Sequence, residues 1–305
     1  MQVAGFTGTF DRALLLCYAY PMEMAAYLRQ VVTVLACEIG VRSFQDRDRL
    51  ARTTDTISGQ LASFGYHVTR QPIRFRGNTY DNLIAELPGT SLPERILVIG
   101  AHYDTVRTTP GADDNASGVA GLLGLARRLS KTRADKTIRF VFFCLEEWPT
   151  CRSKNMGSYH YAGSLKEKGE LVDGMICLEM IGYFSDREGS QHYPLPFMNL
   201  TYPGTGSYLS MVGNVRSRLF TRKIAEGFRK STDLPVITLN APAIVIGIDF
   251  SDHWSFNKFG YKALMVTDTA FYRNPNYHRP GDLPETLDYD RMAKVVEGLA
   301  GAALR

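Results

Sequence analysis

Residues 95–104, RILVIGAHYD, form a continuous apolar run that ends in two ionisable side chains. An apolar run of this kind, without polar alternation, is typical of a β-strand that is buried on both faces. Similar runs occur at residues 138–145 (IRFVFFCL) and 174–181 (GMICLEMI). Strands buried on both faces occur in parallel sheets that are covered by helices. The sequence therefore predicts an α/β fold.

Amphipathic stretches alternate with these strands. Residues 23–39, 46–64 and 115–129 have helical character, the last two with apolar side chains at helical spacing. The C-terminal stretch has the same spacing, with Asp288 as its expected cap. Further strands are expected at residues 67–75, 82–88 and 262–268. The alternation predicts a three-layer α/β sandwich, in which helices flank a central, mixed, mostly parallel sheet.

Ionisable side chains follow three of the predicted strands where each strand ends. These residues are His102, Asp104, Glu146, Glu147 and Glu179. Ligands in such folds bind beyond the carboxyl ends of the strands. The sequence GADDNASG at residues 111–118 adds two aspartates at a helix start, where one would suffice as a cap. Unpaired charges at the edge of a core are costly, and metal ions remove that cost. Imidazole and carboxylate groups together suit zinc.

These motifs, followed by the late Tyr-His at residues 277–278, resemble those of metallopeptidase family 28. That family comprises co-catalytic di-zinc aminopeptidases related to glutamate carboxypeptidases and glutaminyl cyclases. The likeness runs from about residue 23 to the C-terminus. It implies one zinc exopeptidase-like catalytic domain at residues 21–305, preceded by an extension at residues 1–20.

The resemblance implies two zinc ions, with other divalent metals as alternatives. Asp114 would bridge both ions. His102 and Glu179 would complete one site, and Glu147 and His278 the other. The resemblance also implies a cis peptide bond between residues 114 and 115, which would direct the bridging carboxylate at both metals. The family's best-known aminopeptidases have aspartate where this chain has Glu179, so metal occupancy is in question.

The resemblance also implies the roles of two carboxylates that do not bind metal. Glu146 would be the general base, which takes a proton from the metal-bound water and later protonates the departing amine. Asp104 would accept a hydrogen bond from the ring nitrogen of His102 that does not bind metal. Asp113 is expected to be a loop or capping residue rather than a ligand.

Two other segments are expected near the site. The sequence EEWPTCRSKNMGS at residues 146–158 is longer than the short turn common after the Glu-Glu pair, so Trp148, Cys151 and Arg152 are expected to reach the substrate cleft. In FSDHWSF, at residues 250–256, Asp252 and His253 are expected to line the pocket or support its ligands.

The function predicted from these features is metal-dependent hydrolysis of short peptides at the amino terminus. A glutaminyl-cyclase-like acyltransferase and a carboxypeptidase on the same fold are the alternatives, and a binding module that has lost its metals is disfavoured by the full ligand set. A carboxypeptidase needs arginines that grip a carboxylate. Arg152 and Arg273 are the two candidates for that role.

The composition limits the partners. The net charge of +4 over 305 residues is too small to indicate nucleic-acid binding, and the basic run at residues 215–230 is interpreted as a solvated helix face. No run reaches the roughly 20 apolar residues that a membrane span needs. Without a signal-peptide pattern, and with cysteines that lack CxxC spacing, a cytoplasmic protein is expected. The oligomeric state is left open.

Overall fold

The computed structural model describes residues 23–242 and 244–305. Its eight strands form one sheet in the order β1-β2-β4-β3-β5-β8-β6-β7. The strands are β1 (Val68–Phe75), β2 (Asn78–Leu87), β3 (Gly89–His102), β4 (Ala134–Phe143), β5 (Leu171–Leu178), β6 (Leu209–Gly213), β7 (Val236–Asn240) and β8 (Ala263–Thr267). The pairs β4–β3, β3–β5, β5–β8 and β6–β7 are parallel, and the other pairs are antiparallel. The predicted mixed, mostly parallel sheet is confirmed.

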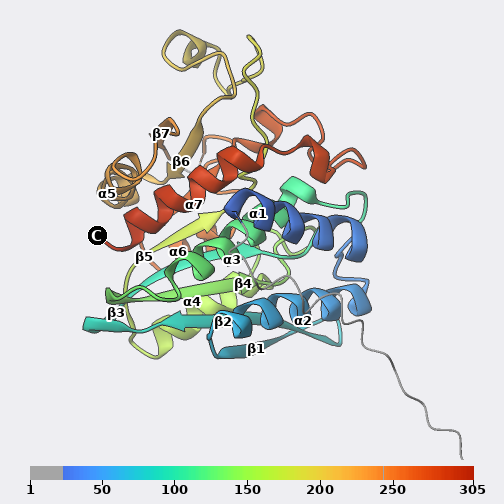
Figure 1. The fold of residues 1–305 in the computed structure, drawn as a ribbon, viewed down its shortest axis with the longest axis vertical. Coiled ribbons are helices and arrows are strands. Elements are labelled where there is room, and N and C mark those ends of the chain that lie inside the picture. Colours follow the sequence, from blue (N-terminus) through green and yellow to red (C-terminus); the bar gives the residue numbers. More distant parts are fainter. Residues whose placement is uncertain (1–22, 243) are drawn as a thin grey trace, which may run out of the picture.

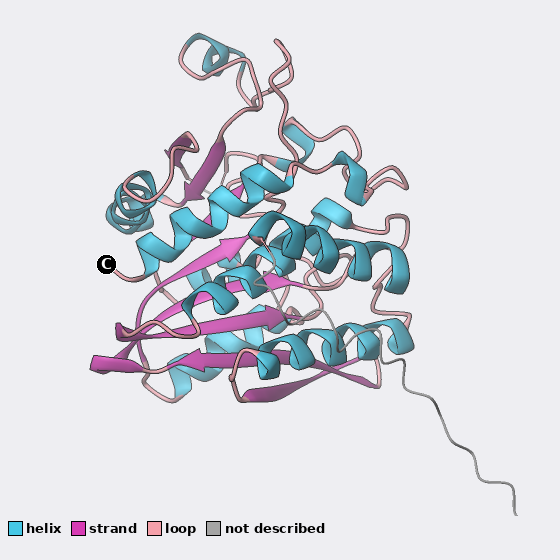
Figure 2. Cartoon of the chain, in the orientation of Figure 1, coloured by secondary structure: helices cyan, strands magenta, loops and turns pink. Residues whose placement is uncertain are grey.

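Helices cover both faces of this sheet (Figures 1 and 2). The helices are α1 (Met24–Thr33), α2 (Arg47–Ser63), α3 (Gly118–Leu129), α4 (Gly157–Glu167), α5 (Arg218–Arg229), α6 (His253–Lys258) and α7 (Tyr289–Ala303). One face carries α1, α2, α3, α5 and α7, whose apolar side chains share one core cluster. The other face carries α4 and α6, which pack in a second cluster. The three-layer sandwich is therefore confirmed.

Strand β3 shows how the sheet separates the two cores. Leu97, Ile99 and Ala101 pack with the cluster that contains α1, α3 and α7. Ile96 and Val98, which alternate with them, pack with the cluster that contains α4 and α6. Because successive strand side chains point to opposite faces, a continuous apolar run is what a doubly covered strand requires.

Helix boundaries differ from the expectation in two places. The helix expected from residue 115 begins at Gly118, because Asp114 and Asn115 have non-helical backbone angles. The stretch expected at residues 23–39 is α1 followed by a π-helical turn, η2 (Val34–Ile39). The cap at Asp288 is confirmed, since its side chain accepts a hydrogen bond from the backbone N–H of Arg291.

Two sequence expectations, on membrane spans and on the cysteines, concern the described part of the chain. No helix among residues 23–242 and 244–305 is both long enough and apolar enough to cross a bilayer. Cys37, Cys144, Cys151 and Cys177 are free thiols. The extension expected at residues 1–20, with Cys17, lies outside the described residues.

Candidate metal centre

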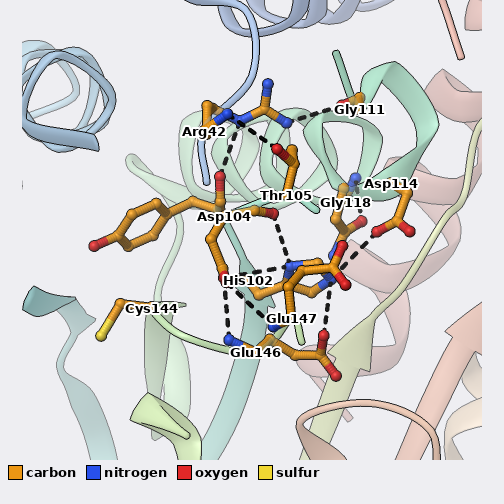
Figure 3. Close-up of polar contacts among 12 residues, drawn as sticks. Arg42, His102, Asp104, Thr105, Gly111, Asp114, Gly118, Cys144, Glu146 and Glu147 are labelled. Carbon is orange, nitrogen blue, oxygen red and sulfur yellow. Dashed lines mark hydrogen bonds and ion pairs between the residues drawn. The ribbon is translucent and has the colours of Figure 1, made fainter. Parts of the chain in front are cut away.

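The predicted site residues converge at one edge of the sheet. Strand β3 ends at His102, and its parallel neighbours β4 and β5 end shortly before the Glu146–Glu147 pair and Glu179. Figure 3 shows His102, Glu146 and Glu147 gathered around Asp104. The strand topology therefore brings together side chains that lie up to 77 positions apart (179 − 102) in the sequence.

Two groups of ligand atoms form where these residues meet. His102, Asp114 and Glu179 make up the first group, and their ligand atoms lie within 4.8 Å of one another. Asp114, Glu147 and His278 make up the second, under the same limit. Asp114 belongs to both groups because its two carboxylate oxygens face different histidines. These five residues are the ones that the family resemblance selects as ligands.

The distances between these atoms test whether a metal fits. Nε2 of His102 lies 3.2 Å from Oε2 of Glu179 and 3.5 Å from Oδ1 of Asp114. Nε2 of His278 lies 3.1 Å from Oδ2 of Asp114 and 3.5 Å from Oε2 of Glu147. Ligands bound at 2.0–2.1 Å to a tetrahedral zinc ion are about 3.3 Å apart. Both groups have the spacing of ligands around a common cation.

Two atoms of the first group lack the partners that burial demands. Among the described residues, neither Nε2 of His102 nor Oδ1 of Asp114 makes a hydrogen bond, although both are buried. Buried polar atoms are almost always hydrogen-bonded, so an orphaned pair that faces one another calls for a further ligand. An imidazole nitrogen and a carboxylate oxygen suit zinc. The residues present therefore fit a bound zinc ion.

The electrostatics indicate the same need for positive charge. Burial raises the pKa of Glu147 well above its usual range, and the neighbouring Asp114 raises it further. Burial lowers the pKa of His102, but the carboxylates of Glu179 and Glu146 outweigh burial and leave this pKa well above its usual value. Without a metal, the imidazolium of His102 is the positive charge that balances the neighbouring carboxylates of Glu146 and Glu179.

The two neighbours of Asp114 hold the loop that carries it. Asp113 accepts hydrogen bonds from the Gly182 N–H at 3.0 Å and from Nδ2 of Asn274 at 2.8 Å. Oδ1 of Asn115 accepts from the Gly118 N–H at 3.1 Å, which caps α3. The peptide bond between Asp114 and Asn115 is cis, as the resemblance implies. Asp113 is in neither ligand group, and its carboxylate bonds Gly182 and Asn274 rather than the start of α3, so it is a loop residue and not a helix cap.

Two buried aspartates each hold a pair of successive peptide N–H groups. Asp104 accepts from the N–H groups of Glu146 and Glu147, both at 3.1 Å (Figure 3). Asp282 accepts in the same way from the N–H of Asp113 at 2.8 Å and of Asp114 at 3.1 Å. Charge-assisted bonds of this kind are short and strong, so they fix the two acidic segments on either side of the site.

The contact expected between Asp104 and His102 differs from its prediction. Nδ1 of His102 lies 3.2 Å from the peptide carbonyl oxygen of Asp104 and 3.7 Å from the carboxylate. The carbonyl is therefore the hydrogen-bond acceptor, because the carboxylate faces the two glutamate amides. The imidazole is still oriented by Asp104, but through its backbone.

A buried arginine supports the same region from α1's side of the sheet. The side chain of Arg42 is fully buried and donates to five carbonyl oxygens, of Leu35, Gly40, Tyr103, Pro110 and Gly111. Figure 3 shows this guanidinium beside the loop that contains Gly111. Burial lowers its pKa to about 10, opposed by the acidic groups nearby. Arg42 thus ties the segment after β3 to the start of the GADDNASG loop.

Glu146 is the carboxylate beside the two ligand groups that belongs to neither. Its Oε2 lies 3.9 Å from Nε2 of His102. Burial raises its pKa well above its usual range, His102 opposes this rise, and Glu179 adds to it. Cys151 lies against the same carboxyl, with its sulfur 3.6 Å from Oε1.

An apolar cavity with a volume of about 90 Å³ opens beside Glu179. Its walls come from β6, β7 and β8 and from three further segments, residues 191–202, 245–250 and 269–277. Val212, Leu239 and Met265 are among the lining residues, with Phe250 from the second of these segments. Ligand pockets are typically concave and mostly apolar, with a few polar groups placed at one side. A ligand in this cavity would touch the first ligand group directly.

Of the other residues expected near the site, Asp252 lies beside it, whereas His253 and Trp148 do not line the cavity. Asp252 is fully buried beside the site, and neither of its carboxylate oxygens makes a hydrogen bond with a described residue. Nε2 of His253 lies 2.7 Å from the carbonyl oxygen of Ile248 and does not face the cavity. The side chain of Trp148 is on the surface, 77% exposed.

The two arginines considered for binding a terminal carboxylate, Arg152 and Arg273, differ in burial and in their partners. Arg273 is buried, and its Nε and Nη1 donate to Gln191 and to the carbonyl oxygens of Tyr183 and Tyr208. Its Nη2 makes no hydrogen bond with a described residue. Arg152 is exposed at 44% of its side chain and pairs with Asp249 at 3.2 Å.

Sequence reasoning missed three residues that hold the site together. Asp282 and Arg42 act through backbone groups that lie 169 and 69 positions away, which no local pattern reveals. Ser251 donates to Oε2 of Glu179 at 2.6 Å. A signal for Ser251 existed, because it directly precedes Asp252 in a segment already suspected of lining the site.

The fold and the paired ligand groups define a metal-binding hydrolase of the α/β class. The model of peptidase family M28 matches residues 82–303. A relative from Escherichia coli (strain K12), the uncharacterized protein YfbL, is 40% identical over 280 residues, which cover 89% of this chain and 85% of YfbL. The chain therefore belongs to peptidase family M28.

Two more distant comparisons agree with this assignment. A probable leucine aminopeptidase of Trichophyton verrucosum is 29% identical over 71% of this chain, and the match spans 55% of that longer protein. The structure of BSAP, a zinc aminopeptidase from Bacillus subtilis, is 17% identical with a TM-score of 0.70, covering 93% of this chain and 95% of the other. At that identity the second likeness establishes the fold alone.

Proposed function

We propose that the protein is an aminopeptidase that binds two zinc ions and removes N-terminal residues from short peptides. His102, Asp114 and Glu179 would hold one ion. Asp114, Glu147 and His278 would hold the other. The observation that carries the proposal is the set of four donor–donor distances between 3.1 and 3.5 Å, which matches ligands on a tetrahedral zinc ion.

Bound zinc ions polarise a peptide carbonyl and lower the pKa of water, which is chemistry that the side chains alone do not supply. Glu146 provides the proton transfer. Its carboxyl lies beside the first ligand group, with Oε2 3.9 Å from Nε2 of His102, and burial raises its pKa. It accepts the proton of the attacking water and passes it to the nitrogen of the departing amine.

The cavity beside Glu179 supports a preference for apolar N-terminal residues. Its lining is mainly aliphatic and aromatic, and Glu179 is the one acidic residue among its lining residues. A side chain that fills it leaves the α-ammonium of the substrate near the carboxylates of the ligand groups. The favourable charge of that position is what an aminopeptidase needs for its free amino terminus.

The alternatives have less support. A glutaminyl-cyclase-like acyltransferase uses one zinc ion, whereas this chain has two complete ligand groups. A carboxypeptidase must grip the terminal carboxylate with arginine, and Arg273 is buried, with hydrogen bonds to Gln191 and to the carbonyl oxygen of Tyr208. Arg152 remains accessible, but it does not line the cavity beside Glu179.

The test compares phenylalanyl-alanine with its N-acetylated form, using zinc-loaded protein. The free dipeptide should be hydrolysed, and the acetylated form should be cleaved far more slowly, because acetylation removes the positive charge that the acidic site attracts. Faster cleavage of the acetylated dipeptide would contradict the aminopeptidase proposal and favour a carboxypeptidase.

A further inference from the structure

Phe250, a residue of the cavity wall, lies between two residues whose side chains are anchored elsewhere in the site. It lines the cavity with Glu179, in the segment between β7 and α6. On one side of it, Ser251 donates to Oε2 of Glu179 at 2.6 Å. On the other side, Asp249 accepts from Nη2 of Arg152 at 3.2 Å. One neighbour thus binds the candidate metal centre itself, and the other binds the loop that follows β4.

Asp249 has few partners for a buried carboxylate. Its side chain is 9% exposed, and its Oδ1 makes no hydrogen bond with a described residue. The described residues supply one ion pair for it, from Arg152 to Oδ2. A buried charge that loses its partner is strongly destabilised. Removal of the guanidinium would therefore drive Asp249 toward solvent, and Phe250, the next residue, would move with it.

The loop after β4 joins Arg152 to the carboxylates of the site. The N–H and the hydroxyl of Thr150 both donate to the carbonyl oxygen of Glu147, at 3.0 and 2.7 Å. The sulfur of Cys151, the residue before Arg152, lies 3.6 Å from Oε1 of Glu146. The ion pair therefore connects the cavity wall to the loop that carries the candidate general base.

The guanidinium also contacts the cavity wall directly. The Cζ of Arg152 lies 5.1 Å from the ring centre of Phe250, which is within the range of a cation–π contact. The ring of Phe271, another lining residue, has its centre 6.5 Å from that of Phe250. The two residues are 38% and 39% exposed. Because core packing holds this part of the wall only weakly, the polar contacts of its neighbours decide its position.

Other contacts hold the earlier part of the segment. The hydroxyl of Tyr272 donates to the carbonyl oxygen of Ile246 at 3.4 Å, and Nε2 of His253 lies 2.7 Å from that of Ile248. Neither contact involves Phe250 or its two neighbours. Loss of the ion pair should therefore shift the aromatic wall while the rest of the segment keeps its hydrogen bonds.

We propose that the ion pair between Arg152 and Asp249 holds Phe250 in the cavity wall and thereby sets how strongly the enzyme selects large apolar N-terminal residues over alanine. This inference rests on the proposed aminopeptidase function and names residues that determine its specificity. A large side chain in the cavity buries apolar surface against the ring, whereas the methyl group of alanine buries little. Arg152 acts through Asp249 and Phe250, so it is a positioning residue.

The experiment measures kcat and KM of the zinc-loaded protein for phenylalanine p-nitroanilide and alanine p-nitroanilide. The wild type should favour the phenylalanine substrate in kcat/KM. In Arg152→Gln and in Asp249→Asn this preference should fall about fivefold, mainly through a higher KM for the phenylalanine substrate, as expected for coupling between residues in contact. Arg152→Lys keeps the charge and should retain part of the preference. The double variant should lose no more than either single variant, because each removes the same ion pair.

Arg49→Gln is the matched control, because Arg49 is 43% exposed and pairs with Asp46 at 3.2 Å, at the start of α2. Its substrate preference should equal that of the wild type. The proposal would be overturned by a wild type without the preference, by a preference that survives both Arg152→Gln and Asp249→Asn, by equal losses for the two substrates, or by losses that multiply in the double variant. Hydrolysis of neither anilide by the zinc-loaded wild type would instead refute the aminopeptidase function itself, so the two failures are distinct.

Discussion

The replacement of Asp104 by asparagine tests how the acidic side chains are held. Asp104 binds the peptide N–H groups of Glu146 and Glu147 with separate oxygens, each at 3.1 Å. Asparagine has one acceptor oxygen, so its amide NH₂ must face the second N–H. One charge-assisted hydrogen bond is lost and a buried N–H is left without a partner, which costs about 2–3 kcal/mol.

For a chain of this size that cost corresponds to a fall of about 4–10 °C in Tm. The zinc-loaded protein is the form to measure, because removal of a negative charge relieves carboxylate repulsion in the metal-free form. The kcat/KM for phenylalanine p-nitroanilide should fall about 100-fold, since both glutamates shift with their backbone.

Asp46→Asn is the control for the same chemical change. Asp46 caps α2 through one bond, to the N–H of Arg49 at 3.1 Å, and it is half-exposed. Asparagine caps helices equally well, so its Tm should stay within about 2 °C of wild type. If Asp104→Asn behaves like Asp46→Asn in both Tm and rate, Asp104 does not position the glutamates.

Three further predictions concern the site. Glu146→Gln should abolish turnover with zinc content unchanged on elemental analysis; residual activity above about 1% would reassign the base. Ser251→Ala removes the 2.6 Å bond to Glu179 and should weaken zinc binding by about 10–100-fold in competition with a chelator, whereas unchanged affinity would make that bond irrelevant. In chelator, the protein should lose thermal stability between pH 5 and 8: burial raises the pKa of Asp252 and of Asp282 to about 7, so the folded state holds protons that the unfolded state releases. A Tm of the metal-free protein that rises with pH over this range would contradict the prediction.

The inner strands were predictable because burial on both faces leaves a strong pattern. The runs that became β3, β4 and β5 are almost wholly apolar, and each delivers its ionisable residue within a few positions of its end. By contrast β6 and β7 have five residues each, and most of β7 is only partly buried, so neither gives a distinct periodicity. β6 and β7, at one edge of the sheet, were therefore missed, whereas β1 and β2 at the other edge were predicted.

The ligand groups were predictable from the order of motifs, but their supports were not. His278 lies in a loop without a local signal, and the family pattern alone selected it. Asp282, four residues later, binds the N–H groups of Asp113 and Asp114 across 169 and 168 positions. Such side-chain-to-backbone bonds depend on tertiary packing, and a sequence pattern gives no register for them.

The cavity also had no sequence signature. Its walls combine strand residues with three segments that are separate in the sequence, at residues 191–202, 245–250 and 269–277. Loop residues have no periodicity that would predict which side chains face inward. The preference for apolar N-terminal residues therefore follows from the three-dimensional structure and not from the sequence pattern.

Anomalous diffraction at the zinc edge, from crystals of zinc-loaded protein, tests the two-metal proposal most directly. The account predicts two peaks per chain, one within about 2.0–2.2 Å of His102 and Glu179 and one within the same distance of Glu147 and His278, with Asp114 between them. In His278→Ala crystals the second peak should disappear while the first remains. A single peak in the wild type, or two peaks away from Asp114, would contradict the account.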